Sequence, residues 1–240
     1  SQWGLQPLDK LPSGERAIDK YTNMILKASL LTQATAKDII ETQQRSGGVF
    51  RSFLPSSMPK ERQFATSVAL SAIFTQATGR SGSEAGTFWR TLWAEPFKGD
   101  TASKLVKFSQ STDPVLQSLN PYEERYGEGG FRYTTQKSGY EVFTNILNAY
   151  EYLKTNDRQR EANDLLSIYA KNRNFGSLAA IQTFIDELNK SMDASGVSGL
   201  DDFIDKIVSV MESEIDEYIG GLSTTPEFKM KQLNSAWQAS

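Results

Sequence analysis

Three glutamates in one glycine-rich stretch are the residues whose types and spacing best suit catalysis. Glu123, Glu124 and Glu128 lie within residues 120–139, close to two tyrosines, Tyr122 and Tyr126. Two carboxyl groups on either side of a glycosidic bond can serve as general acid and nucleophile, provided that an apolar pocket raises the pKa of one of them. Adjacent glutamates in a polar loop are more commonly solvated. A carboxylate-based glycan hydrolase is therefore an alternative function, and solvated loop acids are the plainer interpretation.

Most other catalytic chemistry is excluded by composition. The 240 residues include no cysteine and no histidine. Cysteine nucleophiles, thiolate metal sites, histidine triads and histidine-ligated metals are thus excluded. No phosphate-binding glycine motif occurs in place. We expect no catalytic residues, no metal ligands and no cofactor.

The strongest cluster of acids lies on the last long helix that we expect. Its spacing matches no calcium loop, and two of its members, Asp201 and Asp202, suit the helix dipole in a first turn. A solvated or partner-facing surface is the favoured interpretation. The formal net charge of −3 argues against nucleic-acid binding. No apolar run reaches the length of a membrane span.

Helical periodicity extends over most of the chain. Apolar residues recur at three- and four-residue intervals, and strand alternation is nearly missing. We predict an all-α fold of about nine to eleven helices, packed as one or two bundles. One helix should begin at the capping box of Thr35 and Asp38 and end before Gly47-Gly48.

A second pair of boundary residues predicts the centre of the fold. Pro59 suits the first turn of a helix and Gly79 suits its end, and the residues between them are apolar around most of the circumference. We expect this helix to be buried. Further along, a helix should begin at Ser198 and extend to Ile219, and a short last helix should contain residues 225–237.

Residues 120–139 show no helical period. Four glycines, a proline and three tyrosines predict a long irregular loop, suited to a domain boundary or to binding. We place the boundary after residue 133. An N-terminal helical domain would contain residues 1–133, and a C-terminal helical bundle with a docking tail would contain residues 134–240.

The four tryptophans divide into two pairs. Trp89 and Trp93 are four residues apart and share one helical face, where core packing is favoured and partner contact is the alternative. Trp3 and Trp237 lie near the chain ends. Aromatic side chains on terminal segments suggest docking to a partner.

The order of several motifs in residues 21–133 resembles the phycobilisome linker domain. That family has a stretch like E-x-Q-x-R-x-G, and Glu41, Gln43, Arg45 and Gly47 fit its spacing. A helix ending in Gly-Arg follows in the family, as Gly79-Arg80 do here. The closing family motif resembles this chain at Tyr122, Glu123 and Glu124, at Tyr126-Gly127-Glu128, and at Arg132-Tyr133. The plainer interpretation of the first motif is an ordinary helix C-terminus before a glycine cap.

The chain also departs from the family pattern. The Val-Pro of the closing motif is missing, Thr78 stands where a leucine is usual, and the net charge is mildly acidic. Without cysteine the chain cannot carry a thioether-linked bilin.

The resemblance implies a linker that joins rings of pigment proteins. Such a linker would contact, without a covalent bond, bilins held by its partners, at the cytoplasmic or stromal face of the thylakoid membrane. It implies partner contacts at Arg80, Trp89, Trp93, Tyr126, Arg132 and Tyr133.

We therefore predict a non-catalytic, helical structural or linker protein that binds the protein subunits of a large assembly. The residues expected at its interfaces are Trp3, Arg80, Trp89, Trp93, Tyr126, Arg132, Tyr133 and Trp237. A virion structural protein, such as a phage neck, tail or internal component, is the alternative within this class. The glycan hydrolase is the alternative outside it.

Overall fold

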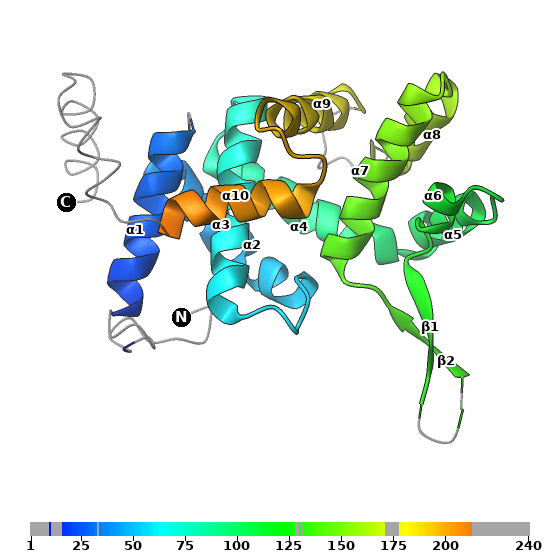
Figure 1. The fold of residues 1–240 in the computed structure, drawn as a ribbon, viewed down its shortest axis with the longest axis horizontal. Helices are drawn as coiled ribbons and strands as arrows, with labels where there is room; N and C mark the ends of the chain where they lie inside the picture. The colour runs from blue at the N-terminus through cyan, green and yellow to red at the C-terminus, as the bar shows by residue number, and fades with distance from the viewer. Residues whose placement is uncertain are drawn as a thin grey trace.

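The fold is helical throughout its core. A computed structural model describes residues 10, 16–32, 34–127, 130, 132–170 and 178–212, and 75% of the interpretable residues are helical. The prediction of an all-α fold with about ten helices is confirmed (Figure 1). The helices are α1 (Ala17–Leu31), α2 (Ala36–Phe53), α3 (Lys60–Thr78), α4 (Gly82–Ala94), a 3-10 turn η1 (Glu95–Phe97), α5 (Gly99–Ser109), α6 (Pro114–Gln117), α7 (Gly139–Thr155), α8 (Gln159–Ala170), α9 (Leu178–Ala194) and α10 (Leu200–Glu212).

Helix α2 begins as predicted and ends later. The Thr35 side chain accepts from the Asp38 N–H, and the Asp38 side chain accepts from the Thr35 N–H, which completes the capping box. The prediction that the helix stops before Gly47-Gly48 is wrong, because α2 continues to residue 53. A glycine inside a helix costs only about 1 kcal/mol relative to alanine. Burial of Ile39 and Phe50 on the face toward the core outweighs that cost.

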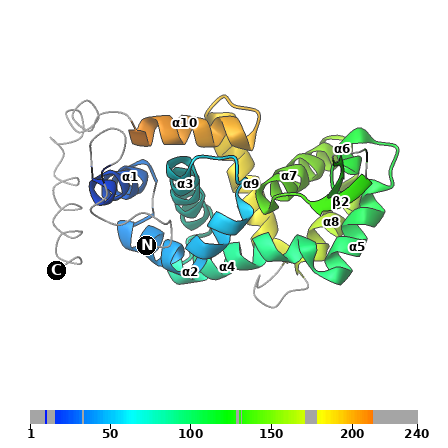
Figure 2. The ribbon, with the colours of Figure 1, turned by 90° about the horizontal axis from the view of Figure 1, so that it is seen from below.

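Helix α3 is the buried centre that the sequence predicts. Pro59 is its N-cap, and Gly79 ends it in the left-handed conformation at a φ of 62°. Every residue from 63 to 75 is buried. The helix contacts α1, α2, α4, α9 and α10, and Figure 2 shows α1 and α10 on two of its sides.

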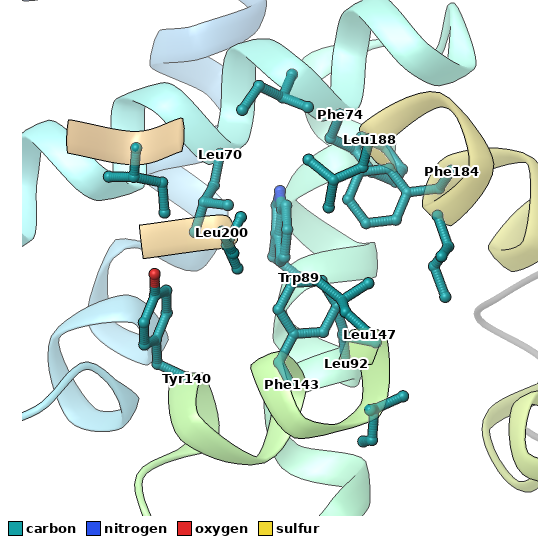
Figure 3. Close-up of a cluster of buried hydrophobic side chains, with 14 of the residues drawn as sticks. Leu70, Phe74, Trp89, Leu92, Tyr140, Phe143, Leu147, Phe184, Leu188 and Leu200 are labelled. Carbon is teal, nitrogen blue, oxygen red and sulfur yellow. The ribbon is translucent and has the colours of Figure 1, made fainter. Parts of the chain in front are cut away.

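One hydrophobic core contains residues from both predicted domains. Aromatic rings of α4 meet rings of α7 and α9: Trp89 lies 5.9 Å from Phe143 and 5.6 Å from Phe184, measured between ring centroids (Figure 3). Helix α3 also packs on α9 and α10. Residues on both sides of the predicted boundary at residue 133 therefore share one core, and the division into two domains stays a prediction.

Most of the described residues from 120 to 139 lie in a β-hairpin, so the prediction of a long irregular loop is wrong. Strands β1 (Tyr122–Tyr126) and β2 (Arg132–Gln136) pair antiparallel and make a two-stranded sheet. The Gly130 N–H donates to the Gly127 carbonyl at 3.1 Å, and Gly130 has a φ of 77°, which favours glycine. Both strands are largely exposed, so neither shows the apolar alternation that identifies a half-buried strand.

Several predictions near the chain ends lie outside the described residues. Helix α10 is described to Glu212, short of the predicted end at Ile219. Trp3, Trp237 and the predicted helix over 225–237 also lie outside the described ranges. In the described part of the chain, no helix has both the length and the apolar character needed to cross a membrane.

Candidate functional site

Two tyrosines of the β-hairpin are the most exposed large apolar side chains in the described part of the chain. The hairpin projects away from the helical body below α7 (Figure 1). Tyr126 is 70% exposed and Tyr133 is 47% exposed. Among the described residues only two other large apolar side chains, Leu26 and Ile40, are exposed. The hairpin is therefore where aromatic surface is most available to a partner.

The strand register sorts the hairpin side chains onto two faces. Directly opposite residues point to the same face of a sheet, and neighbours along a strand point to opposite faces. Tyr126 is opposite Arg132, and Arg125 is opposite Tyr133. We call the side that carries Tyr126 and Arg132 the outer face, and the side that carries Arg125 and Tyr133 the cleft face. Tyr126, Arg132 and Tyr133 together are the tip cluster.

The two described glutamates of the hairpin lie on different faces. Glu124 forms an ion pair with Arg132 on the outer face. Glu123 accepts from Arg125 Nε at 2.7 Å on the cleft face. Each carboxylate thus has its own arginine, and the two do not face a common substrate position. Glu128 lies outside the described residues. The pair of facing carboxylates required by a glycosidase is not formed by Glu123 and Glu124.

A cleft of about 840 Å³ lies at the base of the hairpin. The cleft face of the hairpin lines it through Glu123 and Arg125. The link between α2 and α3 and the first turn of α7 also line the cleft, as do Phe97 of η1 and Asp201 of α10. Polar side chains and charged side chains of both signs line this cleft. Such a lining suits contact with polar groups.

A buried tyrosine ties α7 to α10 in this cleft. The Tyr140 hydroxyl donates to Asp201 Oδ1 at 2.5 Å. Burial raises the pKa of Tyr140 well above its usual range, and the bond to Asp201 raises it further, while the positive charge of Arg62 opposes the shift. The folded protein therefore keeps this hydroxyl protonated at pH values where a free tyrosine ionises.

The raised pKa predicts loss of stability in alkali. Below about pH 10, Tyr140 is protonated in both the folded and the unfolded protein. Above about pH 10, only the unfolded chain releases the proton. The free energy of unfolding therefore falls by up to about 1.4 kcal/mol per pH unit. Tyr140→Phe should cost about 1.5 kcal/mol near pH 8 through the lost hydrogen bond, and the cost should shrink above pH 10. Urea unfolding of both proteins between about pH 8 and pH 11 measures this. Parallel pH profiles for the two proteins would contradict it.

Three of the predicted interface residues lie at the tip of the hairpin, with Tyr126 and Arg132 on the outer face and Tyr133 on the cleft face. Tyr126, Arg132 and Tyr133 form the tip cluster. Arg80 lies in the link between α3 and α4, partly exposed. Trp89 and Trp93 are buried in the core, so their assignment as partner contacts is corrected: the rings are enclosed by the chain's own aromatic residues. Core packing, the favoured sequence interpretation, is what the structure shows for both.

Arg125 and Thr135 are hairpin residues that the sequence interpretation missed. Both line the cleft, and the Thr135 hydroxyl donates to Glu123 at 3.3 Å. The available signal was the arrangement of tyrosine, threonine and opposite charges around the glycines of residues 127–130, which suits cross-strand pairs. Among the described residues, no group of three or more acidic side chains could hold a metal ion. No protein-family profile, no curated protein and no solved structure matches this chain.

Proposed function

We propose that this protein is a non-catalytic component of a larger protein assembly and that it docks through the tip cluster of its β-hairpin. The observation that carries the proposal is the exposure of Tyr126 and Tyr133 on an arm that projects from a well-packed helical body. Tyrosine and arginine are enriched among the residues that dominate binding energy at protein interfaces.

The hairpin is an element that contact with a partner would stabilise. A two-stranded sheet is marginal in water unless it packs on something else. Here Pro121 at the hairpin base is buried, whereas the residues of β1 and β2 nearest the tip are exposed. Contact with a partner would bury the aromatic rings and stabilise the hairpin. This favours a docking role over a role in the core.

The sequence resemblance favours a light-harvesting antenna as the assembly. Two elements of its closing motif, Tyr126 and Arg132-Tyr133, are the tip cluster itself. On this proposal the tip would contact pigment-carrying subunits, including bilins that those subunits hold. Alternatively, the chain would dock by the same hairpin into a virion. The visible colour of the isolated complex distinguishes the two, since only an antenna complex contains bilins.

Two substitutions at the tip test the docking role. The Tyr126→Ser/Tyr133→Ser variant should associate with the assembly at least about tenfold more weakly, because two exposed anchors are lost without change to the core. The matched control is Leu26→Ser, which removes an apolar side chain of 40% exposure from α1. Sedimentation of each tagged variant in an extract of the source cells gives the bound fraction.

Docking through the hairpin is supported if the wild-type chain and the Leu26→Ser variant sediment in a fast-moving complex. The Tyr126→Ser/Tyr133→Ser variant should then remain largely outside that complex. The proposal is overturned by a wild-type chain that sediments alone. Equal sedimentation of the double variant and the wild type would also overturn the assignment to the hairpin.

A further inference from the structure

The hydrogen-bond pattern of the hairpin shows which backbone groups point outward. The Lys137 N–H donates to the Pro121 carbonyl at 3.0 Å, and these two residues are directly opposite in the strand register. Hydrogen-bonded and non-hydrogen-bonded pairs alternate along an antiparallel ladder. Residue 123 therefore forms backbone hydrogen bonds with residue 135, and residue 125 forms them with residue 133. The pairs at 122 and 136, 124 and 134, and 126 and 132 direct their N–H and C=O groups away from the hairpin.

The outer edge of β2 pairs with no other strand in the described part of the chain. No hydrogen bond within the described part of the chain uses the outward N–H or C=O groups of Arg132, Thr134 or Gln136. On the other strand, the Tyr122 N–H already donates to Asn120 Oδ1 at 3.1 Å. Unpaired groups on an edge strand form a template for another strand. The edge carries neither a proline nor a charge at its centre, Thr134.

We propose that β2 pairs with β2 of a second copy of this chain, antiparallel, around a twofold axis at Thr134. In this register Thr134 of one copy faces Thr134 of the other, and Arg132 faces Gln136. Each of these pairs consists of outward-pointing residues, so the two edges exchange six backbone hydrogen bonds and form a four-stranded sheet. A twofold contact of this kind uses the same surface on both copies.

The side chains match in the same register. Thr134 meets Thr134 and Arg132 meets the neutral Gln136 on the outer face. On the cleft face Tyr133 meets Thr135, an aromatic and β-branched pair of the kind that stabilises sheets. No like charges are opposite each other. The equivalent pairing of two β1 edges would place Glu124 directly against Glu124, and like charges opposite each other are destabilising.

This pairing does not depend on the proposed docking role, because it uses the β2 edge whereas docking also requires Tyr126 on β1. The two can therefore fail separately. The test uses the purified full-length chain alone.

Proline substitution on either edge provides a matched pair of variants. Proline is tolerated on an edge strand where the N–H points outward, because no ladder bond within the hairpin is lost. Thr134→Pro removes the outward N–H at the centre of β2, and Glu124→Pro does the same on β1. Thr134→Pro should weaken self-association at least about tenfold, because the two central hydrogen bonds are lost, and Glu124→Pro should leave it unchanged.

Sedimentation equilibrium measures the association from about 1 μM to about 500 μM, a range suited to a small interface. The wild-type mass should rise from 26.8 kDa toward twice that value. A wild-type chain that stays monomeric overturns the proposal. So does a Thr134→Pro variant that associates like the wild type, or a loss of association that is equal in the two proline variants.

A single introduced cysteine gives a second measurement. Because the chain has no cysteine of its own, Thr134→Cys carries one thiol. Directly opposite, hydrogen-bonded residues lie about 5.5 Å apart between Cα atoms, which is within the range of a disulfide. Mild oxidation should link Thr134→Cys into a covalent dimer at least about tenfold faster than Glu124→Cys, the exposed control on β1. Equal rates of dimer formation would overturn the register.

Discussion

Trp89→Ala is expected to lower the free energy of unfolding by about 4 kcal/mol, the range found for large aromatic side chains removed from a core. Trp89 is 0% exposed. Its ring lies 5.6 Å from that of Phe50 and the same distance from that of Phe184, so the truncation leaves a cavity lined by rigid aromatic groups that cannot collapse into it. The expected fall in melting temperature is about 8–16 °C for a chain of this size.

Trp89→Phe is the matched control for this prediction. The indole Nε1 of Trp89 is buried and donates to no partner among the described residues, so phenylalanine removes an unsatisfied donor while it keeps most of the ring contacts. We expect less than half the loss caused by alanine. Urea unfolding followed by circular dichroism measures both variants. A loss below about 1 kcal/mol for Trp89→Ala would contradict the burial of this ring.

Gly82→Ala is expected to lower the free energy of unfolding by about 3 kcal/mol, near the upper end of the usual cost of overpacking. An added Cβ would overlap the backbone of Asp38, with the Asp38 Cα only 2.6 Å away. The two helices are also bonded at this point. The Gly82 N–H donates to Asp38 Oδ1 at 3.1 Å, and the Thr42 hydroxyl donates to the Gly82 carbonyl at 3.0 Å. Relief of the overlap would separate α4 from α2 and weaken both bonds.

Gly48→Ala is the control, because it makes the same chemical change in the interior of α2. A Cβ at Gly48 meets nothing within 4 Å. Alanine there should raise the stability by about 0.5–1 kcal/mol, since it has the higher helix propensity. Thermal unfolding of the two variants should therefore shift in opposite directions. A destabilisation by Gly48→Ala equal to that of Gly82→Ala would contradict the close contact of α2 with α4.

Helix ends with local chemical signals could be predicted from sequence. The reciprocal bonds of Thr35 and Asp38 need only residues three apart, and Pro59 and Gly79 act through their own backbone preferences. The burial of α3 was predicted from apolar residues around most of its circumference. These features depend on neighbours in the chain, which a sequence displays directly.

The errors arose where contacts distant in sequence decide the outcome. Gly47 and Gly48 weaken a helix locally, but burial of Phe50 against the core continues α2 beyond them. The hairpin lacks a buried face, so its strands show no apolar alternation. At the candidate site, the order of family motifs pointed to Tyr126, Arg132 and Tyr133. Only the strand register shows that Tyr126 lies directly opposite Arg132. Trp89 and Trp93 shared a helical face as expected, but their neighbours on α7 and α9 could not be inferred from spacing.

The most direct test of the docking role is site-specific cross-linking from the hairpin. A photoreactive phenylalanine analogue replaces Tyr126 in one tagged version of the chain and Leu26 of α1 in a second version. Each is irradiated in a gently prepared extract of the source cells. We expect the probe at position 126 to form a covalent product with a different polypeptide and the probe at position 26 to form none. A position 126 probe that links to no other polypeptide, in a chain that still sediments within a large complex, would contradict the docking role.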